Sequence, residues 1–195
     1  MTLGKSIRSL GGTQLHYLLL LLLLASCAVT REISPPYKPR AEALVTQLTD
    51  QPYSLHIVEN LPVIARVDMR TRWIEVNARW AEVLMSKDPR LLRAILAHEI
   101  AHDKLGHRRV PADDRHALQQ LELEADEEAV KILHSRGYNP QDYLRAMRMF
   151  KAIEDKNPAG SGEQYYSTHP YAGERLERIE KMIEALGPVP KIPVE

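Results

Sequence analysis

The sequence is poor in cysteine and in aromatic residues, and it has no excess of charge of either sign. Its 195 residues include one cysteine and one phenylalanine, and 26 basic side chains balance 26 acidic ones. A single cysteine excludes a disulfide within the chain. The balanced charge, without a basic stripe, argues against nucleic acid as a partner, because phosphate backbones select such stripes. At this length we expect one domain with a sizeable core.

Long hydrophobic runs are also absent, apart from residues 18–24, which are all leucine. Lys5 and Arg8 precede this run, and small residues follow it. A basic flank, a short apolar stretch and small residues are typical of a secretory signal, which we expect over residues 1–26. A retained transmembrane anchor is the alternative, but it would need about 20 apolar residues.

Cys27, the only cysteine, directly follows the expected signal. The segment Leu24-Ala25-Ser26-Cys27 resembles the lipobox of bacterial lipoproteins, which implies that Cys27 is acylated and becomes the first mature residue. Acyl chains would hold the protein on a membrane surface without spanning it. Because Ala28 replaces the aspartate that would favour the inner membrane, the resemblance implies the outer membrane, facing the periplasm. The alternative is a cysteine that lies near an ordinary cleavage site by chance.

The chain after the signal divides into a tether, one folded domain and a short tail. Prolines make residues 28–40 unsuitable for a helix or a central strand, so residues 27–52 are predicted to be a tether with a short helix at 41–49. Residues 53–187 are predicted to form the domain, and residues 188–195 a proline-rich tail. Three short strands, the last two joined by a hairpin loop, are expected at residues 54–59, 63–67 and 72–76.

From Ala78 onward the pattern is helical. Asp88 and Pro89 are typical of a helix start, and Gly106 is typical of an end, so a long helix is expected between them. Further helices are expected from Asp113 or Asp114 to about 135, from 140 to about 150 and over 173–186, with a loop at 157–167. The sequence therefore predicts an α+β, mainly helical domain in which a small β-sheet precedes the long helix.

The expected long helix carries the motif His98-Glu99-x-x-His102. Helical positions four apart lie on one face, so the two imidazoles are presented at a spacing that a single Zn²⁺ can bridge. Glu99 lies beside them, where its carboxylate can accept a proton from a water molecule that attacks the substrate. The motif therefore predicts a hydrolytic zinc site with Glu99 as the general base.

A catalytic zinc usually takes three protein ligands. The extended motif with a third histidine is excluded, because Leu105 and Arg108 occupy the positions of its glycine and histidine. The next expected helix offers acids instead, since Glu122 and Asp126 are four apart and share a face. One of them could reach the metal while the other accepts a hydrogen bond from a ligand histidine. The alternative for this acidic run is a solvated helix face.

Three motifs in this order resemble metallopeptidase family 48. The resemblance covers roughly residues 55–186 and implies a gluzincin-type metallopeptidase domain. The motifs are His98-Glu99-x-x-His102 with His107, Glu122-x-x-Ala125-Asp126, and Ser167-Thr168-His169-Pro170 with Arg175.

The resemblance also implies a ligand set. One Zn²⁺ per chain would be held by His98, His102 and a glutamate, and the matching glutamate is Glu122 rather than Glu124. Asp126 would be the partner of a ligand histidine.

Further residues are assigned to the site by the family resemblance alone. It implies that His169 approaches the zinc, either as a contact to the transition state or as an inhibitory fourth ligand. Arg175 matches a family arginine that could pair with an acid near the site or steady an oxyanion. We therefore place Glu99, His169 and Arg175 among the catalytic residues, and we expect His107 to be structural.

The resulting hypothesis is a zinc endopeptidase that hydrolyses unfolded or misassembled polypeptides of the cell envelope. Strand 72–76 is expected to pair with an extended substrate. The connection over residues 103–121 is shorter than in many relatives, so a substrate-gating element carried there is expected to be missing. The alternative is a zinc-holding periplasmic chaperone or assembly factor whose site is blocked by His169. A purely structural zinc domain would usually be rich in cysteine ligands.

Overall fold

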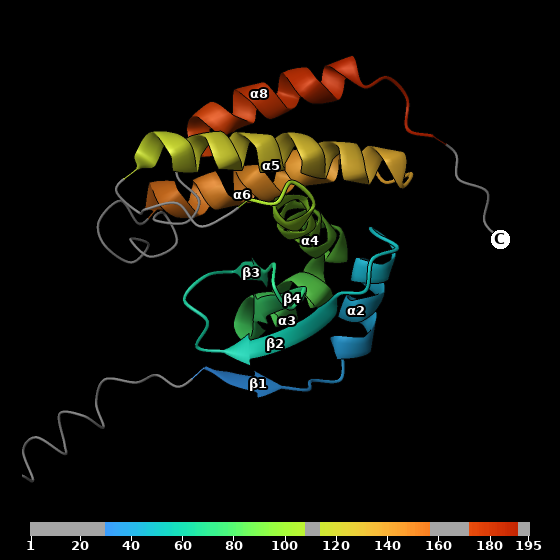
Figure 1. Cartoon of the computed structure of the whole chain (residues 1–195), viewed down its shortest axis with the longest axis vertical. Coiled ribbons are helices and arrows are strands. Elements are labelled where there is room, and N and C mark those ends of the chain that lie inside the picture. The colour runs from blue at the N-terminus through green and yellow to red at the C-terminus, as the bar shows by residue number, and fades with distance from the viewer. Residues whose placement is uncertain (1–29, 108–113, 157–171, 191–195) are drawn as a thin grey trace, which may run out of the picture. The chain divides into compact units, whose positions relative to one another are not determined.

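The computed structural model describes residues 30–107, 114–156 and 172–190 of the chain (Figure 1). The described helices and strands belong to one compact unit, Arg31–Glu195. The expected signal, Cys27, the loop at 157–167 and His169 lie outside the described residues. The hypotheses about them therefore stay predictions.

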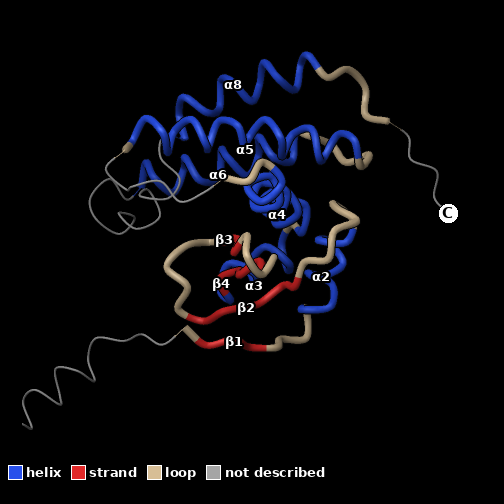
Figure 2. The backbone as a smooth tube through the Cα atoms, viewed as in Figure 1, coloured by secondary structure: helices blue, strands red, loops and turns tan. Residues whose placement is uncertain are grey.

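A four-stranded mixed sheet precedes the long helix, and the predicted α+β class is confirmed (Figure 2). Strands β2 and β4 are parallel, whereas β1 pairs with β2 and β3 with β4 in antiparallel fashion. The three expected strands are all present, shifted by one or two residues at most. In sheet order the strands are β1 (Arg31–Ile33), β2 (Ser54–Glu59), β4 (Trp73–Asn77) and β3 (Ala65–Asp68).

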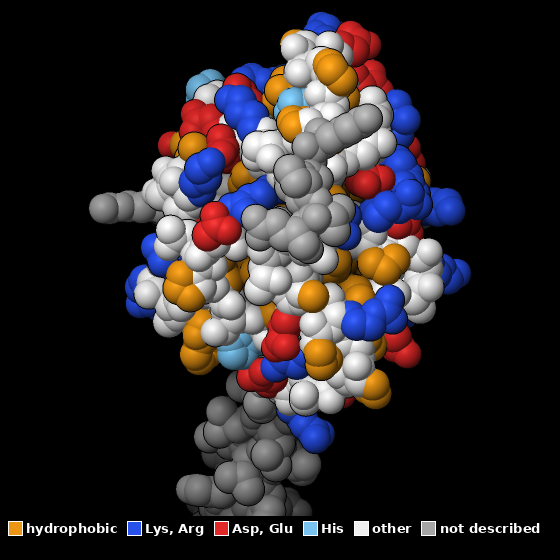
Figure 3. Space-filling model, turned by 90° about the vertical axis from the view of Figure 1, so that its right-hand side faces the viewer, with side chains coloured by type: hydrophobic (Ala, Val, Ile, Leu, Met, Phe, Trp, Pro, Cys, Tyr) orange, Lys and Arg blue, Asp and Glu red, His pale blue; other side chains and the backbone are white. Residues whose placement is uncertain are grey.

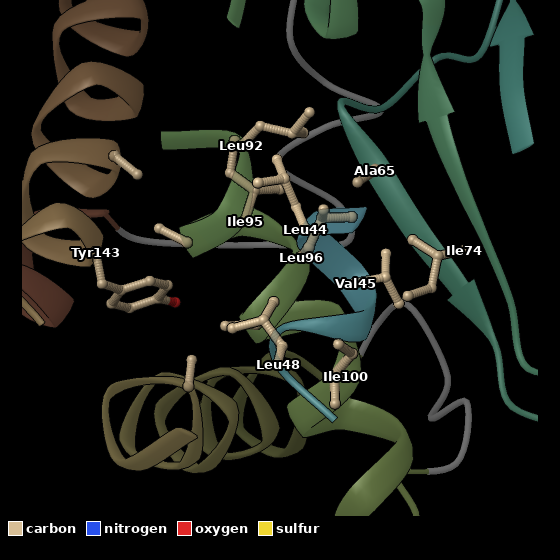
Figure 4. Packing of buried hydrophobic residues seen from close by; sticks show 14 of the residues in the cluster. Leu44, Val45, Leu48, Ala65, Ile74, Leu92, Ile95, Leu96, Ile100 and Tyr143 are labelled. Carbon is tan, nitrogen blue, oxygen red and sulfur yellow. The ribbon is translucent and has the colours of Figure 1, made fainter. Parts of the chain in front are cut away.

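One face of the sheet is apolar, as the alternation of its side chains requires. Leu55 and Ile57 of β2 lie opposite Ile74 and Val76 of β4, and all four are buried. Successive strand residues point to opposite faces, so every second side chain joins the core. Side chains of helix α2 (Lys38–Thr46) pack into the same core (Figure 4).

Two elements lie within residues 27–52, where the sequence predicted a tether with a short helix. Strand β1 pairs with β2, and helix α2 (Lys38–Thr46) begins at Lys38 rather than at residue 41. Pro39 does not interrupt α2 because it lies in the first turn, where no N–H group has an intrahelical partner. The Tyr37 hydroxyl donates to the Ala78 carbonyl at 3.0 Å and holds the segment on the domain. The predicted short helix is therefore present but begins three residues earlier, and β1 is an edge strand rather than a central one.

The expectation that strand 72–76 would offer an edge to a substrate is also wrong. That strand is β4, which lies between β2 and β3 and is paired on both sides. Within the described residues, β3 pairs with β4 alone, so β3 is the open edge on this side of the sheet.

Helix α4 is the centre of the unit. It contacts α2, α3 and β3 on one side and α5 and α6 on the other, and α8 packs on α5 and α6 (Figure 1). Its core residues include Leu92, Leu96 and Ile100, all buried. The helices after the sheet agree with the predicted pattern and are α3 (Ala78–Lys87), α4 (Pro89–Lys104), α5 (Arg115–Ser135), α6 (Gln141–Lys156) and α8 (Ala172–Ala185).

The start of α4 is fixed by Asp88. Its carboxylate accepts from the backbone N–H of Arg90 at 3.2 Å, as an N-cap does, and from the side chains of Arg90 and Arg145. These hydrogen bonds, that of Arg90 first, lower the pKa of Asp88 to about 2. The contact with Arg145 also joins α4 to α6.

Replacing Asp88 by alanine should lower the free energy of unfolding by about 1 kcal/mol, the usual value of an N-cap. Because the pKa is depressed in the folded state, the difference from wild type should be complete at pH 7. It should shrink as the pH falls below the ordinary aspartate range toward 2. Urea unfolding at several pH values would measure the loss of unfolding free energy and its dependence on pH. Asp50→Ala removes an exposed pair with Arg136 and should change little, and an equal loss there would contradict the capping role.

No helix among the described residues is both long enough and apolar enough to cross a membrane. On the face drawn in Figure 3, acidic, basic and apolar side chains are interspersed.

Candidate metal centre

Two histidines of α4 bring their Nε2 atoms to one point. His98 and His102 lie one turn apart, and the two Nε2 atoms are 3.0 Å from each other. Their rings meet edge to face with the centroids 4.6 Å apart. His98 is buried, and His102 is half-buried at the C-terminal end of the helix.

Helix α5, which packs across α4, adds Glu122 to the two histidines. Its carboxylate oxygens lie 3.2 Å from Nε2 of His98 and 3.3 Å from Nε2 of His102. Zinc bonds of 2.0–2.1 Å in a tetrahedral arrangement place neighbouring ligand atoms about 3.3 Å apart. The three ligands that the family resemblance implied therefore lie together, and their donor atoms fit one zinc ion. Glu124 instead faces His107, with 3.2 Å between Oε2 and Nε2.

The Nδ1 atom of His98 faces a buried tyrosine and a buried aspartate. The Tyr143 hydroxyl lies 2.8 Å from Nδ1 and donates to Asp126. Asp126 Oδ1 is itself 3.4 Å from Nδ1. Asp126 thus lies beside a ligand histidine, as expected, but Tyr143 makes the shorter contact. Tyr143 could not be recognised from the sequence, because a tyrosine among apolar helix residues has the pattern of an ordinary core residue.

Arg175 of α8 pairs with acids of the site. Its guanidinium donates to both carboxylate oxygens of Asp126, at 2.7 and 2.6 Å, and Nη1 lies 3.1 Å from Glu122. Burial lowers the pKa of Arg175, but the two acids outweigh it and raise the pKa well above the usual range. Of the two expected roles, pairing with an acid is the one these contacts support.

The Nδ1 atom of His102 has a different partner. It lies 3.0 Å from Nδ1 of His107, whose Nε2 faces Glu124. Gly106, at φ +65°, lets the chain turn back after α4, and the backbone N–H groups of Gly106 and His107 donate to the carbonyls of Asp103 and His102. This Schellman-type ending brings the His107 ring to the ligand histidine. The expected structural role of His107 therefore includes a direct contact with the centre.

Glu99 lies next to the ligands in sequence and in space. It is buried, and it lines a cavity of about 20 Å³ together with His98, Tyr143 and Arg175. That volume is enough for about one water molecule. The apolar walls include Ile64, Ile95, Met147 and Phe150. A cavity of about 1130 Å³ around Tyr37 and Trp80 is lined by none of the predicted site residues.

The centre carries an excess of negative charge. Burial lowers the pKa of His98, yet Glu122 and Asp126 together outweigh it and raise the pKa to about 9. Burial and the charge of His98 lower the pKa of His102. Acids that favour a proton on His98 this strongly also favour a cation at the point where its Nε2 meets Glu122.

Two histidines and a glutamate from adjacent helices, with a further glutamate beside a water-sized cavity, define the class of hydrolytic zinc centres. Residues 115–183 match the family model described as Peptidase family M48. The match supports the membership in this family that the motifs predicted, and family and site together indicate a zinc metallopeptidase. The matched residues include Glu122, Asp126 and Arg175 but not the histidine motif. No curated protein matches the chain.

Proposed function

We propose that the protein is a zinc-dependent endopeptidase that hydrolyses unfolded or misassembled polypeptides of the bacterial cell envelope. The observation that carries the proposal is the convergence of His98, His102 and Glu122 on one point, beside a cavity that Glu99 also lines. One zinc ion per chain is what this ligand set can hold.

The chemistry follows from the residues around the cavity. A bound zinc ion would supply a Lewis acid, which lowers the pKa of a bound water to about 7 and polarises a carbonyl. Glu99 accepts the proton of the attacking water and can return it to the leaving amine. Asp126 and Arg175 hold the ligands in place through the buried contacts described above.

The open edge of β3 is a place where an extended substrate could bind. β3 lies beside α4, and an extended peptide can add to such an edge through backbone hydrogen bonds. A groove of about 950 Å³ follows β3 and reaches Asp103 and Gly106 at the end of α4. Its lining includes acids, arginines and the half-exposed Trp73, which suits loosely specified segments better than one fixed sequence.

The location in the envelope rests on the sequence pattern before the folded unit. The basic flank, the leucine run and Cys27 support export and lipid attachment, so the enzyme would work on a membrane surface facing the periplasm.

Metal removal tests the proposal. The full chain, purified in detergent, should contain close to one zinc ion and cleave unfolded casein. A chelator should abolish cleavage, and one equivalent of zinc should restore it, because the ligands remain folded around the vacancy. His102→Ala should lose zinc and activity together, whereas His134→Ala should lose neither, because His134 is half-buried at the end of α5 and faces the Pro188 carbonyl. One zinc per chain without cleavage would favour the zinc-holding assembly factor instead.

A further inference from the structure

Tyr143 carries a hydroxyl group and is buried within the hydrophobic core. It comes from α6 and is fully buried (Figure 4). The hydroxyl lies 2.8 Å from Nδ1 of His98, and the two rings stack with centroids 6.1 Å apart. The same hydroxyl donates to Asp126.

The direction of these hydrogen bonds is fixed by Asp126. Both of its carboxylate oxygens accept from Arg175, so the group is ionised and can only accept. Tyr143 has one proton, which it must therefore donate to Asp126. The lone pairs of its oxygen then face His98, and the hydrogen bond between them needs a proton on Nδ1. With that proton on Nδ1, the lone pair of the neutral imidazole lies on Nε2, where Glu122 and His102 converge.

We propose that Tyr143 is a positioning residue of the metal centre, which fixes the tautomer and the orientation of His98 by accepting its Nδ1 proton while bound to Asp126. The inference rests on the proposed zinc site and goes beyond it, because it assigns to α6 a part in holding the metal. Arg175, Asp126, Tyr143 and His98 form one chain of contacts that starts on α8 and ends at the ligand atom.

Asp126 alone does not perform this role in the observed geometry. Its Oδ1 lies 3.4 Å from Nδ1, which is beyond the usual range for an N–H···O hydrogen bond, whereas the phenol oxygen is within it. Without the hydroxyl, Nδ1 of His98 would lose this hydrogen bond, and the imidazole would be drawn toward Asp126. That shift would move Nε2 away from the position where it meets Glu122. A tyrosine kept only for its volume in the core would tolerate phenylalanine without any change at the metal.

The test is Tyr143→Phe, which removes the hydroxyl and keeps the ring. Zinc affinity, measured by competition with a chelating dye on folded protein, should fall about 10- to 100-fold, as for other partners of metal-bound histidines. Tyr37→Phe is the matched control, since it removes a half-buried tyrosine hydroxyl that donates to the Ala78 carbonyl and not to a ligand, and it should leave zinc affinity unchanged. Circular dichroism establishes that both variants are folded before zinc is titrated.

A second measurement needs no variant. In the zinc-loaded wild type, nitrogen-correlated NMR of the His98 ring should find the proton on Nδ1, protected from exchange and close to the Tyr143 ring. Unchanged zinc affinity in Tyr143→Phe, or zinc bound through Nδ1 of His98, would overturn the inference. A wild-type chain that does not bind zinc would instead overturn the metal centre itself, so the two failures are distinguishable.

Discussion

Replacing Glu99 by glutamine should lower kcat/KM for casein cleavage by about 10²- to 10⁴-fold, the usual contribution of a general base. The amide has nearly the same shape as the carboxylate, so the buried side chain keeps its place beside the cavity. It cannot accept the proton of the attacking water. Since Glu99 is not among the grouped ligands, zinc content should stay near one per chain.

A carboxylate elsewhere provides the matched control for this substitution. Glu127 on α5 carries the same chemical group but pairs with Lys131 on the surface, so Glu127→Gln should cleave casein like the wild type. Zinc content and cleavage rate are measured on the same preparations. A Glu99→Gln protein that keeps its zinc and most of its activity would rule out Glu99 as the base.

The periodic parts of the fold could be predicted from the sequence. The period-two burial of β2 and β4 and the capping residues around α4 are local signals, and local signals place elements well. The order of the strands is not local, because a parallel β2–β4 pair with β3 outside depends on which faces α3 and α4 cover. That is why the sequence pointed to the wrong strand as the open edge.

The residues of the candidate site also divide into those that local sequence signals predict and those that depend on tertiary contacts. His98, Glu99 and His102 are fixed by helix geometry, whereas the acidic helix offered both Glu122 and Asp126, and the family resemblance selected Glu122 as the third ligand. The role of Tyr143 could not be predicted from residue spacing. It depends on how closely α6 approaches α4, and on which nitrogen of His98 carries the proton. The contact between His102 and His107 likewise depends on the left-handed turn at Gly106.

Arg175→Met should destabilise the protein by about 3–5 kcal/mol, the cost of leaving a buried charge without its partner. Arg175 is the buried cation that faces both Asp126 and Glu122, and methionine has a similar length but no charge. For a chain of this size we expect Tm to fall by roughly 10 °C. Thermal unfolding with and without a chelator measures the effect.

The fall in Tm should be larger with the chelator than without it, because a bound zinc ion can replace part of the lost positive charge. Zinc bound to Glu122 stabilises the folded state by mass action, so the Tm of Arg175→Met should depend on zinc more than that of the wild type. Arg178→Met on the same helix removes an exposed pair with Glu127 and should change Tm far less. Equal losses in the two variants would mean that α8 is stabilised by packing alone. A large loss at Arg175, relieved by zinc, would mean that this arginine and the metal balance the same buried acids.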